Sequence, residues 1–236
     1  MITKRIRSMS LVLAAVVVVA GSRAAECRKA LPVPLKFARI YWEYNASAND
    51  LGVHVTLDAE DWRELRIVNP NDRTIFTVEG RGPYKDLGMT ELFFEGAEPS
   101  LADFPLADLL ALFPEGEYDF VGTMVDGSRL ESVSTFSHAI PAAPSVSVVV
   151  GPANSLVFKW TPVTAPPAGF PSRPIDVVGY EVIVDDFDVI MPATATMVTV
   201  SPEFVASLAP GEQSYEVLAI EANGNQTITA GTFVKP

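Results

Sequence analysis

Few residues in this sequence could carry out acid–base, nucleophilic or metal chemistry. It contains two histidines, His54 and His138, and one cysteine, Cys27. His54 stands between Val53 and Val55 in an alternating segment and is expected to face solvent, and His138 is expected to end a strand at the surface. A zinc site or a Ser-His-Asp triad requires a histidine at a fixed spacing from its partners, and no such motif is present. The sequence therefore predicts no catalytic residue and no enzymatic activity.

Carboxylates crowd two predicted turns. Asp185, Asp186 and Asp188 lie in one of them, and three acidic residues lie between positions 58 and 61 in the other. Calcium takes oxygen ligands from loops of this kind, but neither turn has the Asp-x-Asp-x-Asp-Gly spacing of a dedicated calcium loop. Two interpretations remain open for Asp185, Asp186 and Asp188: a solvated acidic turn, or a calcium site. No other cofactor is expected.

Aromatic side chains could instead stack on sugar rings. Trp42 and Trp160 are each in phase with the apolar residues of an alternating segment, which predicts that both belong to a core. Trp62 follows an acidic residue at the start of a predicted strand, so the alternation does not show whether its side chain is buried or exposed. A sugar-stacking hypothesis therefore rests on Trp62 and Tyr84.

The elements that must position these residues are mostly short strands. Apolar and polar residues alternate in many segments, which is typical of strands with one buried face. Two segments have helical spacing instead: 105–113, which begins with Pro105, and 201–208, which begins with Ser201 as a cap. Asp126-Gly127 is a strong hairpin signal. The predicted strands are residues 37–44, 53–57, 62–68, 74–78, 87–94, 117–125, 129–138, 145–150, 156–160, 180–184, 197–200, 215–220 and a last strand through Phe233.

The two halves of the chain end alike. Each has a short helix, then a tyrosine, a hairpin and a last strand with a phenylalanine, and Tyr118 and Phe136 are as far apart as Tyr215 and Phe233. This internal repeat predicts two copies of one sandwich plan. The proline-rich stretch 141–144 between them predicts a short, stiff linker. We expect an all-β fold of two tandem sandwiches at residues 37–140 and 145–236, each with one short helix before its tyrosine strand.

The second half also contains a set of residues in a recognisable order. They are Trp160-Thr161-Pro162, Tyr180, Leu208-Ala209-Pro210-Gly211, Tyr215-Glu216-Val217 and Asn223-Gly224. With this set, residues 143–236 resemble a fibronectin type III domain. The resemblance implies a tyrosine corner, in which the Tyr215 hydroxyl bonds to backbone a few residues upstream. Gly116, Tyr118 and Phe120 keep part of the pattern, so the first half resembles an immunoglobulin-like sandwich. The family implies binding, spacing or display and specifies no ligand.

The first residues have the pattern of an export signal. Lys4, Arg5 and Arg7 precede an apolar run at 11–20, and small residues follow, which predicts a signal peptide at residues 1–24. Residues 25–36 then form a spacer that contains two prolines. Cys27 could be a lipid anchor, but the acid before it does not fit a lipoprotein cleavage site. The run is too short to span a membrane, and no later segment is long enough.

The charge limits the partners. The formal net charge is −12, and removal of the basic leader makes the mature chain more acidic still. Such a surface repels phosphate backbones, so nucleic acid is excluded as a default partner. We expect a periplasmic or extracellular, non-enzymatic protein that acts as a binding, spacer or surface-associated module. Its expected partner is a protein or polysaccharide of the cell envelope or exterior. The first alternative is a carbohydrate-binding accessory that uses exposed aromatic residues of the first half. A second alternative is an enzyme whose site is not visible in the sequence.

Overall fold

The structure of the chain is a computed structural model that describes residues 30–235. The predicted signal peptide and Cys27 lie outside the described residues. Contacts group Leu31–Pro236 into one compact unit. Its elements are almost all strands, arranged in two sheets, and the fold is all-β as the alternation predicts.

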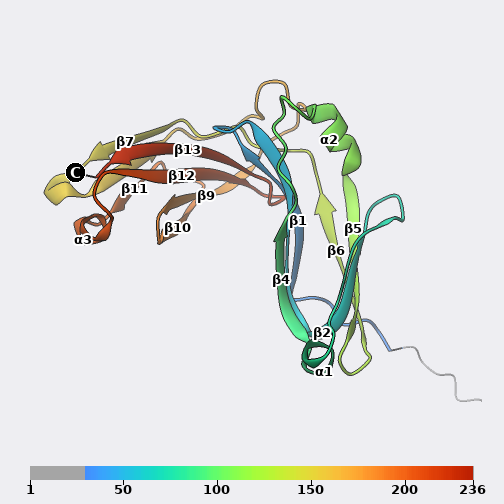
Figure 1. Cartoon of the computed structure of the whole chain (residues 1–236). Helices are drawn as coiled ribbons and strands as arrows, with labels where there is room; N and C mark the ends of the chain where they lie inside the picture. Colours follow the sequence, from blue (N-terminus) through green and yellow to red (C-terminus); the bar gives the residue numbers. More distant parts are fainter. Residues whose placement is uncertain (1–29, 236) are drawn as a thin grey trace, which may run out of the picture. The chain divides into compact units, whose positions relative to one another are not determined.

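The first sandwich consists of the strands β1 to β6 (Figure 1). Its longest strand, β2, pairs with β1 and β4 through its first part and with β5 and β3 through its second part. The register shifts between Asp58 and Trp62, so β2 serves both sides of the core. The elements are β1 Phe37–Asn45, β2 Asp50–Val68, β3 Thr74–Glu79, α1 Pro83–Leu87, β4 Met89–Glu95, α2 Leu106–Leu112, β5 Gly116–Met124 and β6 Arg129–Phe136.

One prediction for this half is wrong, and one predicted strand is present but begins two residues later than expected. The acidic residues between 58 and 61 are not in a turn but at the irregular middle of β2, because the strand bends there without ending. The expected strand at 87–94 begins only at Met89, since Pro83 opens the short helix α1 before it. Both differences arise where a polar cluster or a proline interrupts the apolar alternation that identified the other strands.

The second sandwich contains seven strands in two sheets. The strands β11, β8 and β7 form a three-stranded sheet, and β10, β9, β12 and β13 lie in that order in the larger sheet. Apolar residues from both sheets meet in one core, as in fibronectin type III and immunoglobulin-like sandwiches. The elements are β7 Val146–Val150, η1 Pro152–Asn154, β8 Leu156–Trp160, β9 Val177–Val184, β10 Phe187–Pro192, β11 Met197–Val200, α3 Pro202–Ser207, β12 Glu212–Glu221 and β13 Gln226–Val234.

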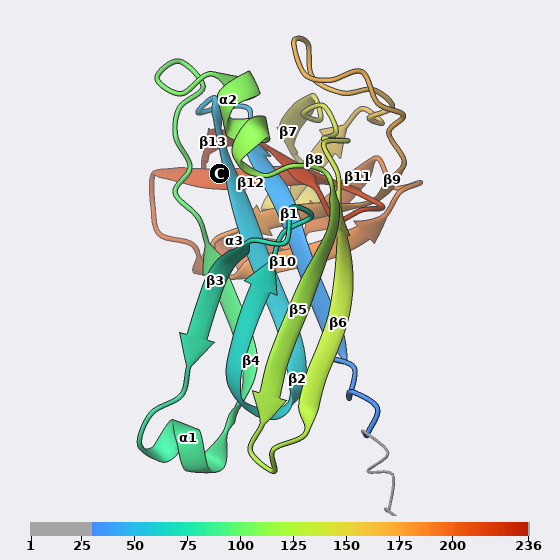
Figure 2. The same ribbon diagram turned by 90° about the vertical axis from the view of Figure 1, so that its right-hand side faces the viewer.

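The helices and hairpins of the repeat are confirmed. Helices α2 and α3 each precede the tyrosine strand, and the Ser201 hydroxyl caps α3 by accepting a hydrogen bond from the Phe204 amide at 3.3 Å. Gly127 and Gly224 occupy the hairpin turns with positive φ. In both hairpins the tyrosine pairs with the residue two before the phenylalanine, so the two registers agree. Figure 2 shows β5 and β6 side by side as one such hairpin.

The tyrosine corner is present in the first sandwich alone. Tyr118 is fully buried, and its hydroxyl donates to the Pro114 carbonyl oxygen at 3.0 Å. Tyr215, by contrast, lies across the sheet over Gly231, where an added Cβ would approach its hydroxyl to 2.5 Å. The glycine leaves a depression that accepts the ring, so the ring does not turn toward the loop. The Gln213 amide donates to the Ala209 carbonyl oxygen at 3.0 Å instead, which corrects the role predicted for Tyr215.

The segment before β1 takes part in the fold. Val33 forms a bridge to Leu130 of β6, and Leu35 is buried in the first core. The Leu35 amide also donates to the Ser132 hydroxyl at 2.9 Å. The ordered fold therefore begins before Phe37. The described end of the predicted spacer is bound to β6 of the first sandwich.

The two sandwiches share one sheet. Strand β1 pairs in parallel with β13, with Glu43 opposite Gln226 and Tyr44 opposite Thr227. This pairing covers the first part of an edge of β13 that would otherwise present free backbone groups. Because β1 also pairs with β2, hydrogen bonds run without a break from β10 to β6.

A buried asparagine connects the same strands to the end of the first sandwich. The Trp42 amide donates to Asn225 Oδ1 at 2.8 Å, and Asn225 Nδ2 donates to the carbonyl oxygens of Ser137 and Ala139 at 2.8 and 2.9 Å. Asn225 is 1% exposed, so these bonds have no competition from solvent. One side chain thus ties β1 and the end of the first sandwich to the last hairpin of the second.

Candidate functional site

Three titratable side chains that could bind a metal ion meet at the outer face of β1 and β2, close to the β1–β13 pairing. Glu43 lies on β1, His54 on β2 and Glu98 in the segment after β4. Within residues 30–235, these three bring one ligand atom each to within 4.8 Å of one another. Gly52, which pairs with Glu43, makes room for Glu98: an added Cβ there would stand 2.5 Å from Glu98 Cγ.

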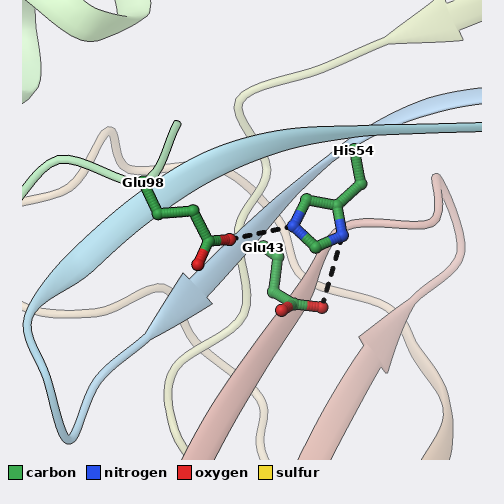
Figure 3. A group of neighbouring side chains, drawn as sticks. All are labelled: Glu43, His54 and Glu98. Carbon is green, nitrogen blue, oxygen red and sulfur yellow. Dashed lines mark hydrogen bonds and ion pairs between the residues drawn. The ribbon is translucent and has the colours of Figure 1, made fainter. Parts of the chain in front are cut away.

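The two nitrogens of His54 face different carboxylates (Figure 3). Nε2 lies 2.9 Å from Glu98 Oε1, a hydrogen-bond distance, whereas Nδ1 lies 3.8 Å from Glu43 Oε2, which is too long for a hydrogen bond. The ring packs between Tyr41 and Phe93, at centroid distances of 5.4 and 6.0 Å. These neighbours leave His54 only 3% exposed.

The electrostatics of the site are dominated by carboxylates. Burial raises the pKa of Glu43, and the charge of His54 and a hydrogen bond from Gln226 act in the opposite direction. Glu98 adds repulsion that raises the pKa of Glu43 further. Burial, and then the charge of Glu43, raise the pKa of Tyr41 to about 12. The site therefore favours a positive charge near Glu43.

The prediction that both histidines are surface residues is wrong. His54 does point to the face opposite Val53 and Val55, as the alternation requires, but that face is covered by aromatic rings and by Glu98. His138 is half-buried, with Nε2 2.8 Å from the Phe113 carbonyl oxygen. The one sequence signal was Gly52, which lies two residues before His54 on the same face and leaves space for an incoming side chain.

The predicted calcium residues lie apart from this group. Asp185 and Asp186 are exposed in the turn between β9 and β10, and Asp188 is exposed on β10. Asp188 shares a hydrogen bond with Glu181, a neighbouring carboxyl whose pKa is raised to about 7 by burial and by that bond. Calcium binding at Asp185, Asp186 and Asp188 stays a prediction.

The residues of the sugar-stacking hypothesis have different environments. Trp62 is fully buried in the first core, so its ring offers no face to a sugar, and that part of the hypothesis is wrong. It packs inward because it resumes the apolar phase of β2 after the bend. Tyr84 is 65% exposed on α1. The predictions that Trp42 and Trp160 belong to the cores are confirmed.

The donor set at His54 suits two kinds of chemistry. An imidazole and carboxylates are ligands that divalent transition metals accept. When the imidazole is protonated, it forms an ion pair with the carboxylates or passes a proton between them. Among residues 30–235, no helix is both long and apolar enough to cross a membrane.

Comparison with known proteins gives fold likenesses at low similarity. No protein-family model matches the sequence, and no curated protein sequence matches it. A two-domain fibronectin type III segment of chicken tenascin is 15% identical, with a TM-score of 0.28, and the match covers 85% of this chain and 98% of that one. The fibronectin(III)-like modules of Clostridium thermocellum CbhA are 13% identical, with a TM-score of 0.28, over 84% of this chain and 94% of theirs.

An enzyme is also among the similar structures. The spore cortex lytic enzyme SleM of Clostridium perfringens is 17% identical, with a TM-score of 0.32, over 40% of this chain. The chain spans 28% of the length of SleM. At such scores the likenesses carry no argument about activity, and the fold described above rests on the pairing of the strands themselves.

Proposed function

We propose that this chain is an exported, non-enzymatic protein of two tandem modules that acts as a rigid spacer and binding module. The modules correspond to residues 37–140 and 145–236, with the linker at 141–144. The observation that carries the proposal is the junction at Asn225. The buried side chain of this residue forms hydrogen bonds with three backbone groups of the first sandwich, one on β1 and two after β6. A spacer must hold its two ends at a constant separation. Hydrogen bonds between the two sandwiches restrict their relative movement and so keep that separation constant.

Further bonds oppose swinging of the linker. The Thr227 and Thr229 hydroxyls of β13 donate to the carbonyl oxygens of Pro141 and Pro144, at 2.5 and 2.6 Å. Pro141 is buried, and proline restricts the chain conformation on its own account. Bending at the linker would break these bonds and the β1–β13 pairing together. The cost of bending is therefore concentrated in one cooperative step.

The partner is a protein or polysaccharide of the cell envelope or exterior. An acidic surface disfavours nucleic acid and anionic membranes. The carbohydrate-binding alternative retains Tyr84 but loses Trp62, and no specific observation favours it.

Distance measurements across the junction test the spacer role. Nitroxide labels at Glu91→Cys and Asp186→Cys, in a Cys27→Ser background, place one probe on an exposed position of each sandwich. We expect a single narrow distance distribution that Asn225→Ala broadens. A broad distribution in the chain with Asn225 intact would refute a rigid spacer. Fractionation of cells that express the full chain tests export separately, and recovery in the cytoplasm alone would refute that part.

A further inference from the structure

We propose that His54 Nδ1 and Glu43 Oε2 bind a divalent first-row transition-metal ion, for which zinc serves as the probe. The site lies on β1 and β2, where Glu43 pairs with Gln226 of the second sandwich. It goes beyond the proposed spacer function and does not depend on it.

The first argument is the tautomer of His54. Glu98 Oε1 accepts a hydrogen bond from Nε2 at 2.9 Å, so the neutral imidazole carries its proton on Nε2. Nδ1 then presents a lone pair. Histidines that bind metals almost always donate their other N–H to a carboxylate or carbonyl in this way, which orients the ring and increases its basicity. Glu98 is thus a positioning residue and not a ligand in this proposal.

The second argument is the unpartnered nitrogen. His54 is 97% buried, by its exposed fraction of 3%, and within the described residues Nδ1 has no hydrogen-bond partner. The nearest acceptor, Glu43 Oε2, stands 3.8 Å away. Two ligand atoms that are each about 2.0–2.2 Å from a zinc ion lie about 3.3–3.6 Å apart at the tetrahedral angle, and further apart as the angle opens. The observed separation fits a shared ion better than a direct bond.

The third argument is charge. Glu43 is partly buried, and one of its carboxylate oxygens lies within 4.8 Å of a carboxylate oxygen of Glu98. Gln226 Nε2 donates to Glu43 Oε2 and holds the carboxylate in place. A divalent cation would offset the repulsion among these acids. The competing interpretation is an imidazolium between two carboxylates, but that ion pair should bring Glu43 to hydrogen-bond distance.

Thermal unfolding of the mature chain in a Cys27→Ser background tests the proposal, because the free thiol could itself bind zinc. We expect zinc at about a hundredfold excess over its dissociation constant to raise Tm by on the order of 5 °C, and chelator to reverse the rise. Magnesium and calcium should have little effect. Cobalt(II) should give visible d–d absorption, and the imidazole nitrogen-15 signal of Nδ1 should shift on zinc binding.

Two variants separate a metal site from a merely structural cluster. Glu43→Gln keeps the shape of the side chain and should unfold near the parent temperature without metal, but lose the response to zinc. His138→Gln is the matched control and should keep the response. The proposal is overturned if zinc shifts neither Tm nor the Nδ1 signal, or if Glu43→Gln responds as the parent does. Protonation of both His54 nitrogens without any zinc response would also overturn it, in favour of the ion pair.

Discussion

Replacement of Asn225 by alanine is expected to weaken the junction between the two sandwiches. The change removes the acceptor of the Trp42 amide and the donor to the carbonyl oxygens of Ser137 and Ala139. Ala139 keeps a second donor, Asn223 Nδ2, at 3.2 Å. The loss therefore comes mainly from the buried Trp42 N–H and the Ser137 carbonyl.

The magnitude follows from these groups. A buried polar group left without a partner costs about 1–3 kcal/mol, and a carbonyl with weak alternatives costs towards the lower end. We expect Asn225→Ala to lower the free energy of unfolding by about 2–4 kcal/mol. For a chain of this size, that lowers Tm by roughly 5–12 °C. Because the lost bonds join the two sandwiches, unfolding should also become less cooperative and separate into two transitions.

The assay is calorimetry and urea unfolding of the mature chain, followed by near-ultraviolet circular dichroism. Asn71→Ala is the matched control, since Asn71 is exposed and its side chain makes no hydrogen bond within the described residues. The control should change Tm by no more than about 1–2 °C, as for other surface substitutions. A single transition at an unchanged Tm for Asn225→Ala would refute the view that this side chain holds the junction.

Three further predictions concern individual side chains. Tyr118→Phe should destabilise the chain by about 0.5–1.5 kcal/mol in urea unfolding, because the Pro114 carbonyl loses its hydroxyl donor, and an unchanged midpoint would contradict the tyrosine corner. Burial, and then a hydrogen bond that protonated Glu181 donates to Asp188, raise the pKa of Glu181 to about 7, so the folded state holds this proton more tightly. The Glu181 carboxyl should therefore lower stability by about 1–2 kcal/mol, discounted for half exposure, as pH rises from about 5 to 8, and Glu181→Gln should reduce the slope by that amount. Trp62→Ala should cost about 3–5 kcal/mol in the same assay, as expected for a core residue, and a cost below about 1 kcal/mol would return Trp62 to the surface.

Local patterns predicted the elements that depend on local interactions. The alternation around Trp42 and Trp160 identified core strands, and Ser201 identified the start of α3, because a cap or a period-two face is determined by neighbouring residues. Patterns failed where the chain bends without stopping, as at 58–61 in β2. They also failed for Tyr215, whose position depends on Gly231 on the opposite strand.

The sequence by itself determined the all-β class, the two-part plan and the hairpin turns at Gly127 and Gly224, since these follow from side-chain alternation and from glycine at specific turns. Tertiary structure alone decided that β1 joins β13 and that Asn225 reaches Trp42, residues that are 183 positions apart. It also decided that His54 is enclosed by Tyr41, Phe93 and Glu98. The physical reason is that a strand's outer face looks the same in sequence whether water or another segment covers it. What covers that face depends on how distant parts of the chain pack.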